Sequence, residues 1–118
     1  MSGTTPVKER AQILSNFKSG NIKVVANVGV LTTGFDHPEL DTIVMARPTM
    51  SLALWYQIVG RAIRPHPQKK ESWIADLCGN IQRFGRVEDL HLYENRPGEY
   101  IIQGYAKGMW KQLTNKYF

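Results

Sequence analysis

Residues 41–77, DTIVMARPTMSLALWYQIVGRAIRPHPQKKESWIADL, decide the fold of this chain. Residues 41–46 are a short apolar run without polar alternation, which is typical of a buried parallel strand, and residues 72–77 are a second strand-like run. Between the two runs, Ser51 can cap a helix that is predicted to end near Arg64, because Pro65 disfavours helical geometry at the residue before it. Strand, helix, strand predicts an α/β layer with a parallel sheet.

The chain before residue 41 continues this pattern. Residues 6–19 predict an amphipathic helix, and the β-branched run at residues 22–27 predicts another buried parallel strand. Three strands are few for a sheet that typically has about five or six. We therefore expect a parallel sheet that is truncated at its N-terminal edge.

The pattern weakens beyond residue 86. Asn95-Arg-Pro-Gly98 indicates a turn, and residues 99–102 are consistent with an edge strand. Apolar and aromatic side chains then recur at a spacing that suggests a last helix, namely Tyr105, Met109, Trp110 and Leu113. We expect residues 87–118 to form a C-terminal extension of the same domain, an edge strand plus a helix.

Composition bounds the class of protein. The chain has 118 residues, of which 42% are hydrophobic and 21% charged, and this is a globular composition. Its single cysteine, Cys78, excludes an internal disulfide and favours a reducing, cytoplasmic setting. No apolar run approaches the roughly 18 residues of a membrane span, so no membrane partner is expected.

The formal net charge is +5, but the distribution of charge says more than the total. Residues 42–70 contain no carboxylate. The same window contains five basic residues, Arg47, Arg61, Arg64, Lys69 and Lys70. It should carry a positive field suited to a polyanion, although chance clustering on a solvated face remains an alternative.

The segment Gln57-Ile-Val-Gly-Arg-Ala-Ile-Arg64 is the strongest candidate site. Gln57, Arg61 and Arg64 are spaced by four and three residues, which places them on one side of a helix. A guanidinium donates two hydrogen bonds at once to a phosphate. Gly60 costs a helix about 1 kcal/mol relative to alanine, and is typical where a ligand approaches the backbone. The alternative is a solvent-facing helix that happens to carry two arginines.

A second candidate site follows the predicted strand at residues 22–27. Ligands of open α/β sheets bind beyond the carboxyl ends of strands. The hydroxyls of Thr32 and Thr33 can bond a phosphodiester, Gly34 permits close backbone approach, and Asp36 is suited to accept from a sugar hydroxyl. An ordinary turn with a local side-chain hydrogen bond is the alternative.

Together the two segments resemble a known family. Leu31-Thr-Thr-Gly-Phe-Asp36, followed by Gln57-Ile-Val-Gly-Arg-Ala-Ile-Arg64, is similar to motifs V and VI of superfamily 2 DNA/RNA helicases, in their second, C-terminal RecA-like domain. Ala75-Asp-Leu-Cys-Gly-Asn80 resembles the segment after motif VI in bacterial and phage DEAD/DEAH-type members. The resemblance implies a RecA-like, P-loop NTPase-type fold, a three-layer parallel sheet with helices on both faces. Residues 1–86 would form part of that domain.

The resemblance also implies roles for individual residues. Its catalytic candidates are Arg61 and Arg64 as arginine fingers, with Gln57 near the terminal phosphate of ATP or the attacking water. Its cofactor-binding candidates are Gly34, Asp36 and Gly60, with Mg²⁺ held by a first RecA-like domain. Its nucleic-acid-binding candidates are Thr32, Thr33, Lys69 and Lys70, although an ordinary solvated loop explains the two lysines equally well. Ile58 replaces an arginine of many RNA-type members, which favours DNA over RNA.

Two motifs of the family do not occur in these 118 residues, the Gly-x-x-x-x-Gly-Lys-Ser/Thr loop and the Asp-Glu-x-His motif. We therefore expect the C-terminal motor domain of an ATP-dependent helicase or translocase that is inactive by itself. The alternatives are a non-catalytic, helicase-like nucleic-acid-binding module and the motor part of a restriction endonuclease. His37, His66 and His91 lack metal-ligand spacing, so no metal site is expected.

Overall fold

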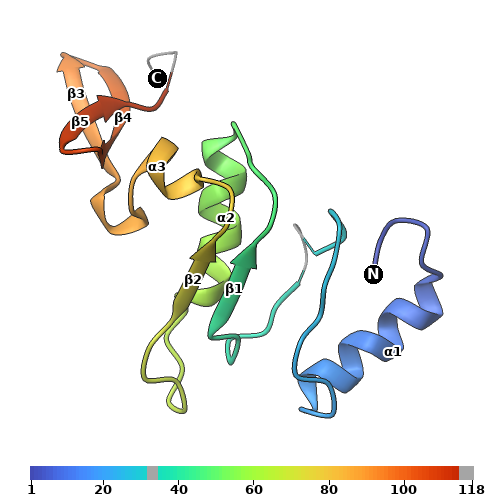
Figure 1. Cartoon of the computed structure of the whole chain (residues 1–118). Coiled ribbons are helices and arrows are strands. Elements are labelled where there is room, and N and C mark those ends of the chain that lie inside the picture. The colour runs from blue at the N-terminus through green and yellow to red at the C-terminus, as the bar shows by residue number, and fades with distance from the viewer. Residues whose placement is uncertain (32–34, 115–118) are drawn as a thin grey trace. The chain divides into compact units, whose positions relative to one another are not determined.

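A computed structural model describes residues 1–31 and 35–114 of the chain (Figure 1). These residues belong to two compact units, Met1–His37 and Pro38–Phe118. Each unit has its own internal contacts, so each is described by itself.

The first unit is built on one helix. Helix α1 (Val7–Lys18) confirms the helix predicted at residues 6–19. Phe17 near its end packs against the rings of Phe35 and His37, with ring centroids 6.4 and 5.4 Å away. The amino group of Met1 donates to the carbonyl of Ala26 at 2.9 Å, which ties the start of the chain to the segment after α1.

The strand predicted at residues 22–27 is wrong, because these residues contain no strand. A β-branched run favours extended backbone, but a strand also needs a neighbouring strand that takes its backbone hydrogen bonds. Here the run is bonded instead to the start of the chain and to the end of α1, where the Ile22 amide donates to Asn16. Val24 is 80% exposed, so the run is not buried either.

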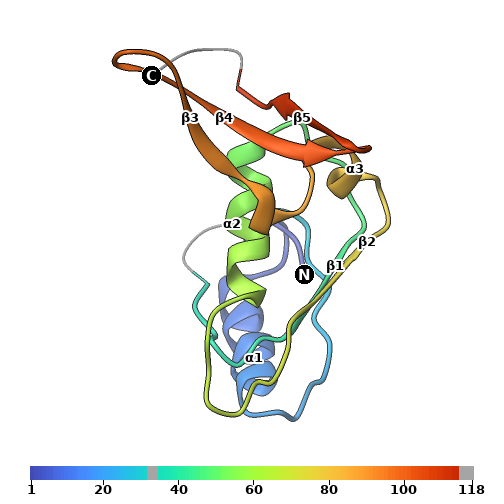
Figure 2. The same ribbon diagram turned by 90° about the vertical axis from the view of Figure 1, so that its left-hand side faces the viewer.

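The second unit contains the predicted strand–helix–strand layer. Strands β1 (Thr42–Met45) and β2 (Trp73–Asp76) pair in parallel, and helix α2 (Leu52–Ala62) connects them (Figures 1 and 2). The pairing runs from Thr42 opposite Trp73 to Met45 opposite Asp76. This confirms the α/β class and the parallel sheet predicted from residues 41–77.

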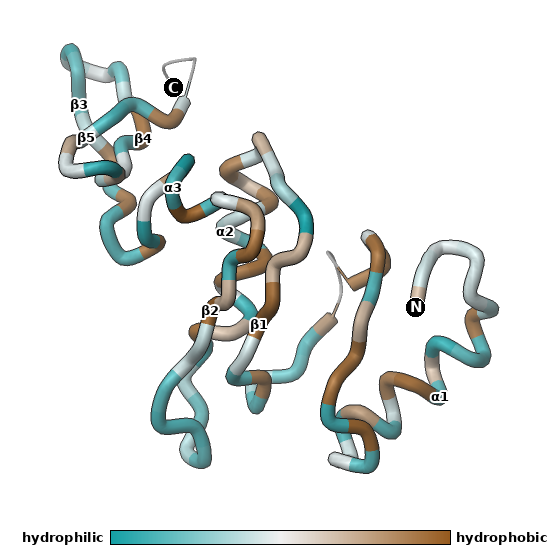
Figure 3. The backbone as a smooth tube through the Cα atoms, viewed as in Figure 1, coloured by the Kyte–Doolittle hydropathy of each residue, from teal (hydrophilic) through white to brown (hydrophobic). Residues whose placement is uncertain are grey.

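The hydrophobic core of this unit lies where α2 meets the sheet. Trp55, Val59 and Ala62 are almost completely buried, and Trp55 is 1% exposed. Met45 of β1 and Phe84 complete the cluster, and the indole of Trp55 stacks on the Phe84 ring at 6.4 Å. Figure 3 shows hydrophobic positions along β1 and β2, and Ile43, Met45 and Ile74 of these strands belong to the core cluster or pack against it. The buried residues of α2 recur at helical spacing, which places them on one side of the helix.

The rest of the second unit is a short helix and an antiparallel sheet. Helix α3 (Asn80–Phe84) and the 3₁₀ turn η1 (Val87–Asp89) precede the sheet. The sheet has the order β3 (His91–Arg96), β4 (Glu99–Ala106), β5 (Met109–Gln112). β4 is its central strand, so the predicted edge position for residues 99–102 is wrong.

The predicted last helix is also wrong, because residues 105–112 form a hairpin. Tyr105 pairs with Trp110 and Ala106 with Met109 across a tight turn. Both turn residues have positive φ, 53° at Lys107 and 80° at Gly108, which a helix does not tolerate. The apolar spacing suited a helix, but the Lys107-Gly108 turn divides it between two strands.

Close backbone packing joins the sheet to α3. A Cβ atom on Gly104 would clash with the carbonyl oxygen of Phe84 and lie 2.8 Å from Cδ1 of Leu113. Only glycine therefore lets β4 approach the end of α3 this closely. The domain boundary after residue 86 stays a prediction.

We expect Trp55→Ala to lower the free energy of unfolding by about 3–5 kcal/mol, because it removes the largest side chain of a small core. Tyr56→Ala is the matched control, since Tyr56 is the next aromatic residue on α2 and is 56% exposed. Urea denaturation followed by circular dichroism measures both. Equal losses in the two variants would contradict the assigned core.

Candidate functional site

The candidate site lies on the outer face of α2. The helix begins at Ser51, whose hydroxyl accepts a hydrogen bond from the Leu54 amide at 3.2 Å, as expected for an N-cap. Burial of the opposite stripe leaves Gln57 exposed and Arg61 partly exposed. The sequence therefore presents this face because the apolar residues take the other one.

The position of Arg64 differs from the prediction. Helix α2 ends at Ala62 and Ile63 is its C-cap, so Arg64 lies beyond the helix rather than on its face. Pro65 explains the early end, because its ring disfavours helical geometry at the residue before it. Gln57 and Arg61 share a helical face, as predicted, and Arg64 lies in the loop that follows the helix.

The two guanidinium groups nevertheless interact. Partial burial lowers the pKa of Arg61, and the positive charge of Arg64 lowers it further. The guanidinium of Arg61 keeps its positive charge at neutral pH, because the pKa of an arginine starts far above that range. Two like charges on a partly desolvated surface are stabilised by an anion that bonds both.

A buried asparagine holds the loop that leads into α2. Asn80 is 0% exposed, and its Oδ1 accepts from the Thr49 amide at 2.8 Å. Its Nδ2 donates to the carbonyl of Arg47 at 3.1 Å and to Oδ1 of Asp76 at 2.9 Å. The Thr49 hydroxyl in turn accepts from the amide of Ser51, the N-cap of α2. The start of α2 is therefore fixed to the end of β2.

Two further side chains complete this arrangement. Oδ2 of Asp76 accepts from the Ile81 amide at 2.7 Å, and Nη1 of Arg83 donates to the carbonyl of Thr49 at 3.0 Å. The loop between β1 and α2 is thus hydrogen-bonded to two side chains of α3, Asn80 and Arg83.

A lysine holds the other end of α2. The ammonium of Lys69 donates to the carbonyls of Ala62 at 2.6 Å, Leu40 at 3.0 Å and Pro38 at 3.3 Å. The hydroxyl of Ser72 donates to the same Ala62 carbonyl at 2.6 Å. A helix leaves its last carbonyls without partners in the helix, and these bonds satisfy one of them.

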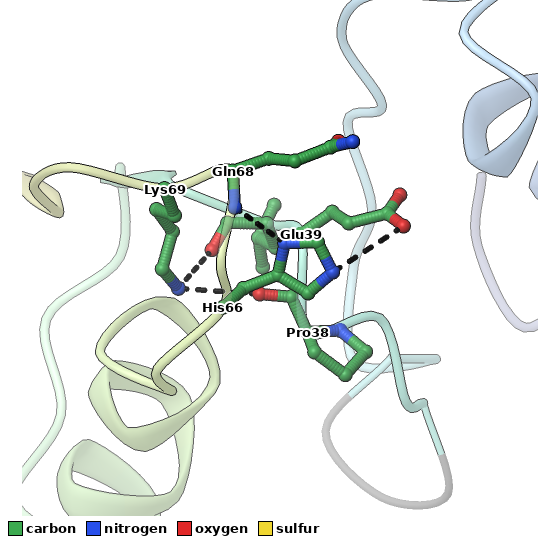
Figure 4. Close-up of polar contacts among 6 residues, drawn as sticks. Pro38, Glu39, His66, Gln68 and Lys69 are labelled. Atoms are coloured by element: carbon green, nitrogen blue, oxygen red, sulfur yellow. Dashed lines mark hydrogen bonds and ion pairs between the residues drawn. The ribbon is translucent and has the colours of Figure 1, made fainter.

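The loop that carries Lys69 has its own contacts. Nδ1 of His66 accepts from the Gln68 amide at 3.3 Å, and Nε2 of His66 lies 3.7 Å from Oε1 of Glu39 (Figure 4). The loop therefore attaches to the segment before β1 through two side chains, His66 and Lys69.

Lys69 was predicted to contact nucleic-acid phosphate; in the structure its ammonium donates to backbone carbonyls instead, and the phosphate contact stays a prediction. An ammonium group has three N–H donors, and all three of Lys69 point at backbone carbonyls. Lys70 is exposed, and its phosphate contact stays a prediction.

The other candidates fall in different parts of the chain. Thr32, Thr33 and Gly34 lie outside the described residues, so the structure does not bear on them. Asp36 is exposed and belongs to the first compact unit, and its role stays a prediction.

Gly60 stands in open space on α2, since a Cβ atom there would meet nothing within 4 Å. The fold itself therefore does not require glycine at this position, in contrast to Gly104.

Residues 1–66 match the helicase conserved C-terminal domain. The chain belongs to this family. The matched range includes both candidate segments, residues 31–36 and 57–64. The family is RecA-like, and this agrees with the parallel β1–β2 pair and α2.

This helicase C-terminal domain is similar to parts of three longer proteins. The chain is 41% identical over 71 residues to the "Putative ATP-dependent helicase IRC3" of Saccharomyces cerevisiae, which covers 60% of the chain and 10% of the relative. It is 31% identical over 112 residues to a "51.5 kDa protein" of a Lactococcus phage, covering 95% of the chain and 23% of the relative. It is 37% identical over 113 residues to the "Putative mitochondrial ATP-dependent helicase irc3" of Schizosaccharomyces pombe, covering 96% and 18%. The chain thus spans no more than about a quarter of these relatives.

No group of three or more histidine, cysteine, aspartate or glutamate residues in ranges 1–31 and 35–114 is placed to hold a metal ion. Over the same ranges, no helix is long and apolar enough to cross a membrane.

Sequence reasoning missed the residues that hold α2. Asn80 appeared only within a family-like segment, and Lys69 only as a surface charge. The available signal for Asn80 was a polar residue four positions after a carboxylate at the end of an apolar strand. For Lys69 no local signal exists, since two of its three partners are 29 and 31 residues away.

We expect Gly60→Ala to stabilise the domain by about 1 kcal/mol, because alanine is the better helix former and its Cβ meets no obstacle. If a ligand approaches the backbone here, the same variant weakens ATP hydrolysis in the full-length protein. Urea denaturation and steady-state ATPase assays measure the two effects. A destabilised variant would show that the site is more crowded than the structure indicates.

Proposed function

We propose that this helicase C-terminal domain is the motor half of an ATP-dependent nucleic-acid helicase or translocase. In this proposal Arg61 and Arg64 contact the terminal phosphate of ATP held, with Mg²⁺, by a first RecA-like domain of the same protein. The observation that carries it is the exposed face shared by Gln57 and Arg61 on a helix secured at both ends, inside the range that matches the helicase family.

The proposed chemistry is charge stabilisation. Negative charge on a transferred phosphoryl group needs positioned donors, and an arginine finger is worth about a thousandfold or more in rate. Gln57 lies one helical turn before Arg61 on the same exposed face, which suits it to the terminal phosphate or to the attacking water. These groups act only while the two RecA-like domains are closed on the nucleotide, so opening couples hydrolysis to movement along the strand.

The proposed nucleic-acid contacts come from the other candidate residues. Thr32, Thr33 and Lys70 would bond backbone phosphates, and Gly34 and Asp36 would lie beside the nucleotide, with Asp36 on the ribose. Ile58 at the position of an arginine in many RNA-type relatives supports DNA as the substrate. The names of the two yeast relatives support ATP-dependent helicase activity for the full-length protein. A non-catalytic helicase-like module is the outcome if the arginines prove dispensable.

Arg61→Ala in the full-length protein should lower kcat for ATP hydrolysis about a thousandfold, because the guanidinium is lost, while the protein stays folded, because Arg61 is not one of the buried residues of α2. Arg61→Lys should recover little, since an ammonium cannot reproduce the two-pronged donation of arginine. Arg96→Ala, an exposed arginine on β3, is the control. Normal turnover of the Arg61→Ala protein would overturn the arginine-finger assignment.

The 118-residue chain should bind single-stranded DNA weakly, with an affinity that falls as salt rises, because residues 42–70 are basic and carry no carboxylate. Lys70→Ala should reduce the slope of log affinity against log salt by about one. Fluorescence anisotropy with a labelled oligonucleotide measures both, and an RNA of the same sequence tests the preference for DNA. Absence of binding at low salt would count against this surface.

A further inference from the structure

We propose that Lys69 is a positioning residue for Arg61, and that it acts by fixing the last turn of α2. This inference rests on the proposed role of Arg61 as an arginine finger. Lys69 itself touches neither nucleotide nor nucleic acid in this proposal; it acts through the helix that carries the finger.

The ammonium of Lys69 joins the end of α2 to the segment before β1. Its ammonium bonds the carbonyl of Ala62, which is the residue after Arg61, and the carbonyls of Leu40 and Pro38, which lead into β1. The end of α2 is thereby attached to the sheet through one side chain. The last turn of α2, which carries the backbone of Arg61, cannot shift without stretching the bond to Ala62 or moving the segment before β1 with it.

The group of carbonyls around Lys69 suits an ammonium group. Three carbonyl oxygens accept from one nitrogen, and an ammonium offers three donors and no acceptor. Its positive charge lies at the C-terminal end of α2, where the helix dipole stabilises a cation. A methionine of similar length would leave those three carbonyls without this donor.

The last turn of α2 needs restraint. Partial burial and then the positive charge of Arg64 lower the pKa of Arg61, so the two like charges disfavour each other, and helix ends fray readily. Repulsion between the two groups favours conformations in which they separate. Lys69 and Ser72, both bonded to the Ala62 carbonyl, oppose that separation. They therefore hold Arg61 ready for an anion before the anion arrives.

The test compares Lys69→Met with Lys8→Met in the full-length protein. Lys8 is an exposed lysine of α1 and serves as the matched control. ATP hydrolysis is measured at saturating nucleic acid, and nucleic-acid affinity is measured over a range of salt. Thermal melts monitored by circular dichroism report whether each variant is folded.

We expect Lys69→Met to lower kcat about 10- to 100-fold, because a misplaced catalytic group costs rates of this order. The KM for ATP and the salt slope of nucleic-acid binding should stay unchanged. Unchanged kcat would overturn the inference. A salt slope reduced by about one with unchanged kcat would assign Lys69 to nucleic-acid phosphate instead.

Combining Lys69→Met with Arg61→Ala separates positioning from general support of the fold. If Lys69 acts through Arg61, the double variant is no slower than Arg61→Ala alone, whereas independent effects would multiply. Multiplying effects would therefore overturn the inference.

Ser72→Ala tests the same carbonyl more gently and replaces Lys69→Met if the latter does not fold. It should lower kcat by a smaller factor, again with no further effect in the Arg61→Ala background, and an unchanged kcat would overturn the inference. Failure of the proposed function is distinguishable from failure of this inference. Normal turnover of the Arg61→Ala protein would overturn the arginine-finger assignment, whatever the result for Lys69→Met.

Discussion

Helix α2 can present charged groups to a ligand because hydrogen bonds hold it at both ends. At its start, buried Asn80 bonds the loop at Thr49, and that loop bonds the capping residue Ser51. At its end, Lys69 and Ser72 share the carbonyl of Ala62. Between these points the helix is pressed onto β1 and β2 by its apolar stripe. The helix that carries the outer face is therefore restrained at both ends.

Rigidity matters because the charges on this face repel each other. Arg61 is partly desolvated and close enough to Arg64 for its pKa to fall. A flexible segment would relieve this repulsion by letting the two groups separate. A helix secured at its end keeps them near each other, and an anion then gains from both at once. In the function that we propose for this helicase C-terminal domain, the anion is a phosphoryl group in transfer.

The C-terminal sheet illustrates how backbone packing can override side-chain pattern. The residues from Tyr105 to Leu113 have helical spacing, yet they form a hairpin, because the Lys107-Gly108 turn has positive φ at both positions. The hairpin then lies against α3 through Gly104, where no side chain fits. The run at residues 22–27 illustrates the converse: its β-branched residues favour a strand, but without a neighbouring strand none forms.

The amino-acid sequence by itself determined the local and periodic features of this protein. Helices α1 and α2, strands β1 and β2, the burial of Trp55 and the shared face of Gln57 and Arg61 follow from spacing, capping and proline, which act over a few residues. The family followed from two short motifs in order. Only the tertiary structure decided that Lys69 bonds Pro38 and Leu40, that Asn80 holds the loop before α2, and that β4 is a central strand. The first two outcomes depend on residues about 30 positions apart, and no local pattern encodes which distant carbonyl a lysine will reach.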